Sequence, residues 1–397
     1  MSSGTNSPET PESPETLAQG TVAEGYEAVR EVFEETLAEE RSGHSAQLAA
    51  YVDGRRVVDL WGGPGIAGDS LVGVYSSTKG AAHLVVALLV QEGVLKLDEK
   101  VARYWPEFGS AGKEDITLRE LMSHRAGVIG VEGGFTPEEM ADDRALAARL
   151  AGQRPFWRPG SAFGYHGLVI AALTGEVVLR ATGQTMHELY ESRIRAPYGL
   201  DLYMGLPEEQ EHRFLSTQPM DPTPEQKALM RQAAAGPDSL PGIALNRNHP
   251  VHPTDLETFP NSRAVRAGGN ASAAGVGSAR GLARMYAAAI GEVDGRAPLL
   301  TPETAAEFAQ IHSQGHDLVF REHYAFGVGF IAVADAMPFL GSRSFGHGGA
   351  AGSQAFADPS AGLGFGYTRR RFGYPETSRT QSRRLAEAVR RAAVSAG

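Results

Sequence analysis

The sequence predicts an α+β fold, an α/β sandwich in which strands from both chain ends form one antiparallel sheet flanked by helices. Two β-prone runs, 47–52 and 55–61, surround Asp53-Gly54 near the start of the chain, an arrangement typical of a hairpin. Short strand-like runs separated by turn residues return after about Tyr324. The stretch 101–300 carries mostly helical patterns, so we expect a largely helical insertion between the two parts of the sheet.

Two helices are expected beside the hairpin in the first hundred residues. Apolar residues follow helical spacing over 21–40, with Glu and Arg between them, and predict an amphipathic helix. The run 83–90 is apolar, and no charge stands between Lys79 and Glu92. This pattern predicts a buried central helix that ends near Gly93. The run is too short to span a bilayer.

The remaining elements follow from the same signals. The segment 237–269 is rich in Pro, Asn and Gly and predicts a long irregular loop. A further helical stretch begins at Asp98, and helices are expected at 117–122, 168–180 and 277–290. Strands are expected at 326–333, 344–346, 354–357 and 362–367, followed by a basic amphipathic helix at 379–393.

These elements divide the chain into four parts. We expect a disordered acidic tail over 1–20 and the N-terminal part of the α/β domain, with the buried central helix, over 21–100. A mostly helical region follows over 101–300, and the C-terminal part of the α/β domain occupies 301–397. The tail lacks the apolar segment of a secretory signal, so a cytoplasmic protein is the simplest expectation.

The composition is that of a soluble globular protein, with 42% hydrophobic and 21% charged residues. A net charge of -10 argues against a nucleic-acid binder, which usually presents a basic face. The absence of cysteine excludes disulfides, thiolate metal sites and cysteine nucleophiles. The pairs His249/His252 and His312/His316 lack a third partner and no HExxH motif occurs, so we expect these histidines to face solvent, with neither a metal nor another cofactor.

A serine and a lysine stand three residues apart at the head of the apolar run, in Ser76-Ser77-Thr78-Lys79. A serine hydroxyl is a weak nucleophile unless a neighbouring base takes its proton. One helical turn places residues i and i+3 on one face, so Lys79 can reach Ser76 if a helix begins here. The positive end of that helix also favours an alkoxide and a nearby oxyanion. The pattern therefore predicts a nucleophile and its activating amine.

The same spacing occurs once more, at Ser110-Ala111-Gly112-Lys113, so the motif alone does not identify the site. This second match lies in a polar, glycine-containing stretch, 108–115, that predicts a surface loop. We therefore expect Ser76 to be the catalytic serine. No G-x-S-x-G occurs, which disfavours the nucleophile elbow of an α/β-hydrolase.

Three further segments accompany Ser76-x-x-Lys79 in a characteristic order and at characteristic separations. They are Ile116–Gly127, Trp157–Gly160 followed by Gly164-Tyr165-His166, and Gly346–Ala350. Together they resemble the motifs of the serine β-lactamase and penicillin-binding protein superfamily. The chain looks most like the branch related to AmpC-type β-lactamases, which includes the family VIII carboxylesterases. The resemblance covers nearly everything except the tail and implies the serine β-lactamase/DD-peptidase fold.

By this resemblance, Ser76, Lys79 and Tyr165 would be the catalytic residues and would lie against one another. An adjacent ammonium favours a phenolate, so Tyr165 could move a proton between Ser76 and the leaving group and later activate water. Whether Lys79 or Tyr165 is the general base stays open. The resemblance also implies an oxyanion hole made by the backbone N–H groups of Ser76 and Ala350.

The third motif departs from the penicillin-binding pattern, which commonly has a lysine, a hydroxyl residue and a glycine. Here His347-Gly348-Gly349 stands in its place. A histidine is mostly neutral at pH 7 and Gly348 has no side chain, so carboxylate recognition should be weak. Gly167 stands where the second motif often has an asparagine. Both departures favour simple esters as substrates, with His347, Gly348, Gly349 and His166 as the expected substrate-binding residues.

The sequence therefore predicts a serine carboxylesterase that hydrolyses small carboxylic esters through an acyl-enzyme on Ser76. A β-lactamase, a D-amino-acid amidase or peptidase, and an acyltransferase would use the same apparatus and are the alternatives. A binding module with a relic site is disfavoured because Ser76, Lys79 and Tyr165 are intact. The expected partner is a small-molecule ester, with no nucleic acid and no membrane, and the oligomeric state stays open. His124 is expected to be structural.

Overall fold

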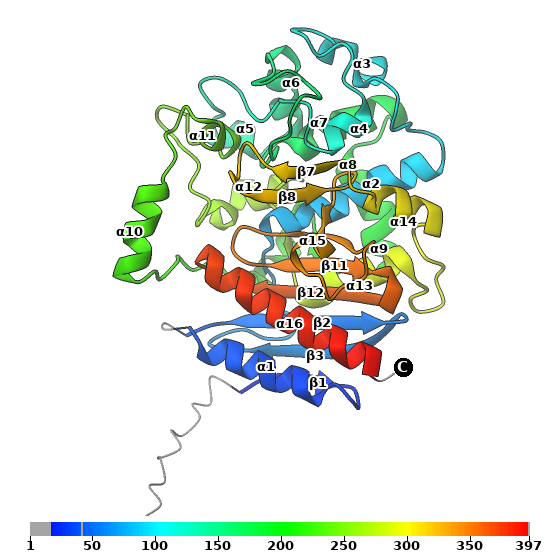
Figure 1. Cartoon of the computed structure of the whole chain (residues 1–397), viewed down its shortest axis with the longest axis vertical. Coiled ribbons are helices and arrows are strands. Elements are labelled where there is room, and N and C mark those ends of the chain that lie inside the picture. The colour runs from blue at the N-terminus through cyan, green and yellow to red at the C-terminus, as the bar shows by residue number, and fades with distance from the viewer. Residues whose placement is uncertain (1–16, 41–42, 396–397) are drawn as a thin grey trace, which may run out of the picture.

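The computed structural model describes residues 17–40 and 43–395, and its main feature is one large antiparallel sheet (Figure 1). The strands of this sheet are β1 (Gln19–Val22), β2 (Ala46–Val52), β3 (Arg55–Gly62), β7 (Ser313–His316), β8 (His323–Phe326), β9 (Ile331–Ala332), β10 (Phe345–Gly348), β11 (Gln354–Asp358) and β12 (Leu363–Arg369). Within the described residues, their order is β1-β3-β2-β12-β11-β10-β9-β8-β7. β2 pairs with β12, with Leu48 opposite Tyr367, so the sheet joins both ends of the chain as predicted.

Helices cover both faces of this sheet. On one face lie α1 (Glu27–Ala38) and α16 (Pro375–Ser395), which Figure 1 shows side by side in blue and red across the strands. Several of their apolar side chains, among them Phe33 and Leu385, are fully buried against the sheet. On the other face α13 (Ala279–Ile290) packs against β2 and β12. The predicted α+β sandwich is confirmed.

Two glycines of β12 explain how closely α13 approaches the sheet. A Cβ atom at Gly364 would lie 2.5 Å from the carbonyl oxygen of Ala283, and one at Gly366 would lie 2.4 Å from that of Ala279. Larger residues at these positions would push the helix away from the strand. Because side chains alternate along a strand, Tyr367 can fill the core on the opposite face.

The region between the two parts of the sheet is rich in helices, as predicted, and its centre is α2 (Thr78–Gln91). Every residue of α2 from Thr78 to Leu89 is buried. A small second sheet lies in this region, with β4 (Val72–Gly73), β6 (Val276–Gly277) and β5 (Leu202–Tyr203). The helices here include α3 (Val101–Tyr104), α4 (Leu118–Met122), α5 (Pro137–Met140), α6 (Asp143–Gly152), α7 (Ile170–Thr182), α8 (Met186–Tyr190), α9 (Ala196–Tyr198) and α10 (Pro224–Ala233). Across residues 17–40 and 43–395, no helix is both long and apolar enough to cross a membrane.

The start of the chain differs from the prediction. The helix expected over 21–40 begins only at Glu27, because the preceding residues form β1 along the edge of β3. A four-residue strand that begins with Gln and Gly carries too little apolar alternation to be recognised in the sequence. β1 also includes the end of the expected tail 1–20, of which residues 1–16 lie outside the described part.

Two other segments also differ. The irregular loop expected over 237–269 contains α11 (Leu240–Ala244) and α12 (Arg263–Gly268), which are too short to show apolar periodicity. The strand expected over 326–333 is divided between the end of β8 and β9, with a turn at Gly329, whose φ is +83°. Two short helices, α14 (Pro302–Ala309) and α15 (Val333–Ala336), lie in the C-terminal part of the chain. The boundaries of the four predicted parts stay predictions.

Candidate active site

Ser76 lies in a tight turn at the start of the central helix. The 3-10 turn Tyr75–Ser77 runs directly into α2. Tyr75 has a φ of +49°, in the left-handed region that a bulky residue adopts only at an energetic cost. Its buried ring packs edge-on against Phe372, with 5.6 Å between the ring centroids, which helps to hold this conformation. Ser76 is left partly exposed while Tyr75 and Ser77 are buried.

Lys79 reaches back along α2 to Ser76. Its Nζ lies 3.1 Å from Ser76 Oγ, 2.6 Å from the carbonyl oxygen of Gly167 and 2.7 Å from that of Ser272. Carbonyl oxygens can only accept hydrogen bonds, so Nζ donates one N–H to each of them. The remaining tetrahedral position of the nitrogen faces the serine. The side chain is fully buried, and burial lowers the pKa of the amine well below the usual lysine value. A neutral Lys79 in this position can direct its lone pair at the Ser76 hydroxyl.

Tyr165 lies beside both residues. The Lys79 amine faces its ring, with Nζ 4.8 Å from the ring centroid. Burial raises the pKa of the Tyr165 phenol, and the nearby Ser76 side chain only partly offsets this effect. The expectation of a phenolate beside an ammonium is therefore wrong for the free protein, because burial disfavours both charges. The structure brings Ser76, Lys79 and Tyr165 together with a protonated phenol.

His347 lies on β10 next to these residues. Its Nδ1 is 2.7 Å from the carbonyl oxygen of Gly348, which assigns the ring proton to Nδ1. Nε2 is then an acceptor and lies 3.5 Å from the Tyr165 hydroxyl oxygen. Burial lowers the pKa of His347 well below its usual value, so the ring is neutral. Ser77 Oγ donates to the His347 carbonyl oxygen at 3.2 Å and ties β10 to the start of α2.

Gly349 lets the end of β10 approach the turn that precedes Ser76. A Cβ atom at Gly349 would lie 2.3 Å from the carbonyl oxygen of Val74. Any other residue would therefore force the strand and the turn apart. Ala350 comes next and is exposed, and Ser76 is partly exposed. The role of their N–H groups as an oxyanion hole stays a prediction.

His166 and His124 are fully buried behind Tyr165. His166 Nε2 accepts from the backbone N–H of Val128 at 3.2 Å, and its Nδ1 lies 2.8 Å from the carbonyl oxygen of Gly164. His124 has a φ of +62°, and its Nδ1 accepts from the backbone N–H of His166 at 3.1 Å. Both rings therefore organise the backbone around Tyr165, which fits the structural role expected of His124. The same placement argues against the expected substrate contact of His166.

Two residues that sequence reasoning missed also support this arrangement. Ser272 offers its carbonyl oxygen to Lys79. Asp317 is fully buried, and its Oδ1 accepts from the backbone N–H of Tyr165 at 3.2 Å. Neither had a signal in the sequence. The first acts through a backbone oxygen, which every residue has, and the second lies 152 residues from its partner.

The second serine–lysine match forms no such pair. Lys113 Nζ donates to the carbonyl oxygens of Ser110 at 2.9 Å and Gln153 at 2.7 Å. The Ser110 hydroxyl donates to the carbonyl oxygen of Ala151 at 3.1 Å. The segment is a loop, as predicted, but Lys113 is buried in it rather than exposed.

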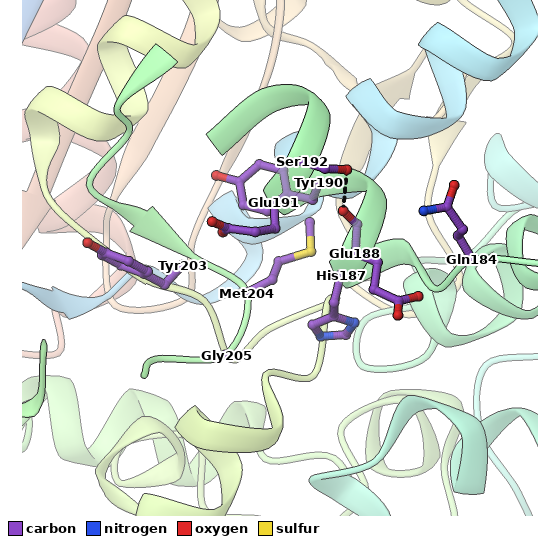
Figure 2. Close-up of a pocket in the computed structure, with 9 residues that line it drawn as sticks. All are labelled: Gln184, His187, Glu188, Tyr190, Glu191, Ser192, Tyr203, Met204 and Gly205. Carbon is purple, nitrogen blue, oxygen red and sulfur yellow. Dashed lines mark hydrogen bonds between the residues drawn. The ribbon is translucent and has the colours of Figure 1, made fainter. Parts of the chain in front are cut away.

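Two hollows lie near the surface of the described residues. One, of about 520 Å³, lies between α8 and residues 203–205 at the end of β5, and Figure 2 shows the side chains that line it. His187 of this hollow already hydrogen-bonds to the carbonyl oxygen of Gly269 at 2.7 Å. The second, of about 530 Å³, is lined in part by Ile243, which also packs in the cluster that contains Tyr165. In the described part of the chain, no group of three or more His, Cys, Asp or Glu is arranged to hold a metal ion.

Comparisons with known proteins cover almost the whole chain. Residues 29–390 match the family model described as Beta-lactamase. The chain is 30% identical over 352 residues to Esterase/beta-lactamase LipL of Mycobacterium tuberculosis (strain ATCC 25618 / H37Rv), which spans 83% of this chain and 77% of that protein. The structure of EstA from Arthrobacter nitroguajacolicus Rue61a is similar, with a TM-score of 0.82, 43% identity and coverage of 92% of this chain and 98% of that one. A family VIII carboxylesterase is similar with a TM-score of 0.80, 31% identity and coverage of 93% and 99%.

Proposed function

The chain belongs to the beta-lactamase family and is a serine hydrolase of that fold, and we propose that it hydrolyses small carboxylic esters through an acyl-enzyme on Ser76. One observation carries the proposal. The Lys79 amine is fixed by two carbonyl oxygens and faces Ser76 Oγ at 3.1 Å. A buried amine with a lowered pKa can take the serine proton and so activate the nucleophile.

In the acylation step, neutral Lys79 takes the proton of the Ser76 hydroxyl while Oγ bonds to the ester carbonyl carbon. The electron pair of the carbonyl π bond moves to its oxygen, and the N–H groups of Ser76 and Ala350 receive the oxyanion. Lys79 is then an ammonium. Two of its N–H bonds already point at the carbonyl oxygens of Gly167 and Ser272, so the new charge is stabilised where it forms.

The leaving alcohol departs past Tyr165. The bond between the carbonyl carbon and the alkoxide oxygen breaks, and the Tyr165 hydroxyl gives its proton to that oxygen. The phenolate expected from the sequence arises at this stage, next to the Lys79 ammonium. In deacylation, water gives a proton to the phenolate as its oxygen attacks the acyl carbon. Ser76 Oγ then leaves and takes its proton back from Lys79, so all three groups return to their starting states.

Simple esters suit this site better than β-lactams or peptides. His347 occupies the position of the usual third-motif lysine, and its neutral ring accepts at the Tyr165 hydroxyl instead of offering a positive charge. Gly348 has no side chain with which to bind a substrate carboxylate. The names of EstA and the family VIII carboxylesterase support the same choice, whereas LipL is named for both activities.

The proposal is tested by removing the nucleophile. Ser76→Ala should lower hydrolysis of short p-nitrophenyl esters by at least about a thousandfold, because the acyl-enzyme can no longer form. Ser110→Ala is the matched control and should retain full activity. Retained hydrolysis in the Ser76 variant would exclude the assignment.

The alternatives are separated by intact-mass analysis after incubation with a panel of esters and β-lactams. A serine esterase should show short-lived acyl adducts with esters, which disappear in the Ser76→Ala variant. Faster turnover of a chromogenic cephalosporin than of any ester would favour a β-lactamase. Transfer of the acyl group to an added alcohol or amine in preference to water would favour an acyltransferase.

A further inference from the structure

Four aromatic rings lie nearly parallel beside the candidate site. The Tyr165 ring is stacked on Phe320, with 4.6 Å between centroids and 20° between planes. Phe320 is stacked in turn on Tyr324, at 4.4 Å and 18°. Phe326 is near-parallel to both tyrosines, at 6.0 Å from Tyr165 and 5.8 Å from Tyr324. We call these four residues the aromatic stack.

Phe320 is the member of the stack that faces solvent most. Its side chain is 37% exposed, whereas Tyr165 is 4% exposed and Phe326 is fully buried. A large apolar ring gains little by remaining in water, so its exposed surface is available to a ligand. Because Phe320 stacks directly on Tyr165, this surface continues the wall that begins at the proposed catalytic phenol.

Asp317 fixes Phe320 to Tyr165. Its Oδ1 accepts from three backbone N–H groups, those of Tyr165 at 3.2 Å, Val319 at 2.8 Å and Phe320 at 2.8 Å. The carboxyl group is fully buried, so these bonds are not exchanged with water. One oxygen atom thus joins the loop that carries Phe320 to the backbone of Tyr165.

The loop is held at two more points. The backbone N–H of Leu318 donates to the carbonyl oxygen of Phe163 at 3.1 Å, and that of Asp317 donates to the carbonyl oxygen of Glu322 at 2.9 Å. Arg321 turns the chain with a φ of +62°. Phe320 is therefore part of a preorganised wall rather than a loosely attached surface ring.

We propose that Phe320 forms the wall of the subsite for the leaving alcohol, that this subsite prefers aromatic alcohols, and that Asp317 is its positioning residue. The inference rests on the proposed function. If the Tyr165 hydroxyl protonates the leaving oxygen, the alcohol portion of the ester must lie along Tyr165, and its next neighbour is Phe320. An aromatic ring in the alcohol can pack against the exposed part of the Phe320 ring, and such a contact favours an aryl-containing substrate by roughly 3- to 10-fold.

The test compares two acetates whose alcohols have similar basicity, benzyl acetate and ethyl acetate. In the native protein the ratio of kcat/KM for benzyl to ethyl acetate should be well above one. Phe320→Leu keeps an apolar side chain but removes the ring, so this ratio should fall about 3- to 10-fold, mainly through KM for benzyl acetate. The ratio for ethyl hexanoate to ethyl acetate should stay constant, because that series varies the acyl side. Ile311→Ala, which changes an exposed apolar residue outside the stack, is the matched control for both ratios.

The role of Asp317 has its own readout. Asp317→Ala removes the acceptor of three N–H groups and should lower the benzyl to ethyl ratio in the same direction as Phe320→Leu. Asp317→Asn retains an Oδ1 acceptor and should restore most of the ratio, which a general loss of stability would not do. Melting temperatures are measured in parallel to show whether each variant is folded. If Asp317→Ala does not fold, the result with Phe320→Leu alone tests the aromatic subsite.

The outcomes separate this inference from the proposed function. If the native protein hydrolyses both acetates and Phe320→Leu leaves their ratio unchanged, the aromatic subsite is excluded and the esterase assignment stands. The same conclusion follows if Phe320→Leu changes only the ratio of kcat/KM for ethyl hexanoate to ethyl acetate. If the native protein hydrolyses neither acetate and forms no adduct at Ser76, both proposals fail together.

Discussion

The amine nitrogen of Lys79 lies 3.1 Å from the hydroxyl oxygen of Ser76, in a buried position where no neighbouring side chain is needed to orient it. The carbonyl oxygens of Gly167 and Ser272 fix the amine through its other N–H bonds. Its orientation toward Ser76 is thus built into the backbone of two segments that lie far apart in the sequence. As the proposed general base, an amine held in this way would lose little entropy in the transition state.

Replacement of Lys79 should therefore remove activity without changing the shape of the site. Lys79→Met keeps the length of the side chain but cannot accept a proton, and kcat/KM on short esters should fall by about a thousandfold or more. Lys96→Met changes an exposed lysine and should have no effect. Substantial activity in Lys79→Met, measured with a p-nitrophenyl ester, would mean that another group is the base.

The pH dependence of kcat/KM should reveal the pKa of the buried Lys79 amine. Below its pKa Lys79 is protonated and cannot act as a base, so kcat/KM should rise with pH through that pKa. Because burial lowers the pKa of Lys79, the rise should occur well below the usual lysine range. Burial raises the pKa of Tyr165, so no loss should appear where a free tyrosine ionises. A profile that rises only in the usual lysine range would contradict the neutral amine.

Buried histidines should make the protein sensitive to acid. Burial lowers the pKa of His83 to about 3 and that of His166 to about 4, so both stay neutral in the folded protein. The unfolded chain binds protons at histidine below about pH 6.5. The free energy of unfolding should therefore fall as the pH drops from 6.5, by about 1.4 kcal/mol per pH unit for each such histidine, until the pH reaches the folded-state pKa.

Urea unfolding at pH 7 and pH 5 measures this effect. In His83→Leu, the loss of stability between the two pH values should be about 2 kcal/mol smaller than in the native protein. His212→Leu, at an exposed histidine, serves as the comparison and should keep the native loss. An equal loss in both variants would show that His83 is not the group responsible.

The contact between β10 and the nucleophile turn can be tested at Gly349. Gly349→Ala would place a Cβ atom 2.3 Å from the Val74 carbonyl oxygen, so it should cost about 1–3 kcal/mol in stability and reduce kcat. Gly152→Ala at the end of α6, where no atom lies within 4 Å of the added carbon, should be close to neutral. Unfolding curves and ester kinetics on the two variants decide whether the close approach matters.

The sequence predicted those features of the site that depend on local spacing. Ser76 and Lys79 meet because they lie one helical turn apart, and the hairpin of β2 and β3 follows from alternation around Asp53-Gly54. The acceptors of the Lys79 amine could not be predicted in the same way. They are backbone oxygens, which carry no residue-type signal, and they lie 88 and 193 residues from Lys79.

The protonation states of Tyr165 and Lys79 also could not be predicted from the sequence. The expected phenolate at Tyr165 followed from an ammonium nearby, but burial acts on both groups, and burial is a property of the assembled fold. The buried contacts of His166 are another case, because its ring nitrogens bond to Val128 and Gly164 rather than face the open site. Proximity along the motif could not distinguish these orientations.

The pairing of β2 with β12 has a consequence for how the protein is made. Gln47 on β2 and Thr368 on β12 hydrogen-bond at 3.1 Å although they are 321 residues apart. During translation, the first hairpin leaves the ribosome long before its partner strand exists, so its open edge must be shielded from other chains while synthesis continues. β10, which completes the surroundings of Ser76, is also synthesised late. A nascent chain should therefore acquire its catalytic chemistry only after nearly all of its residues have been joined.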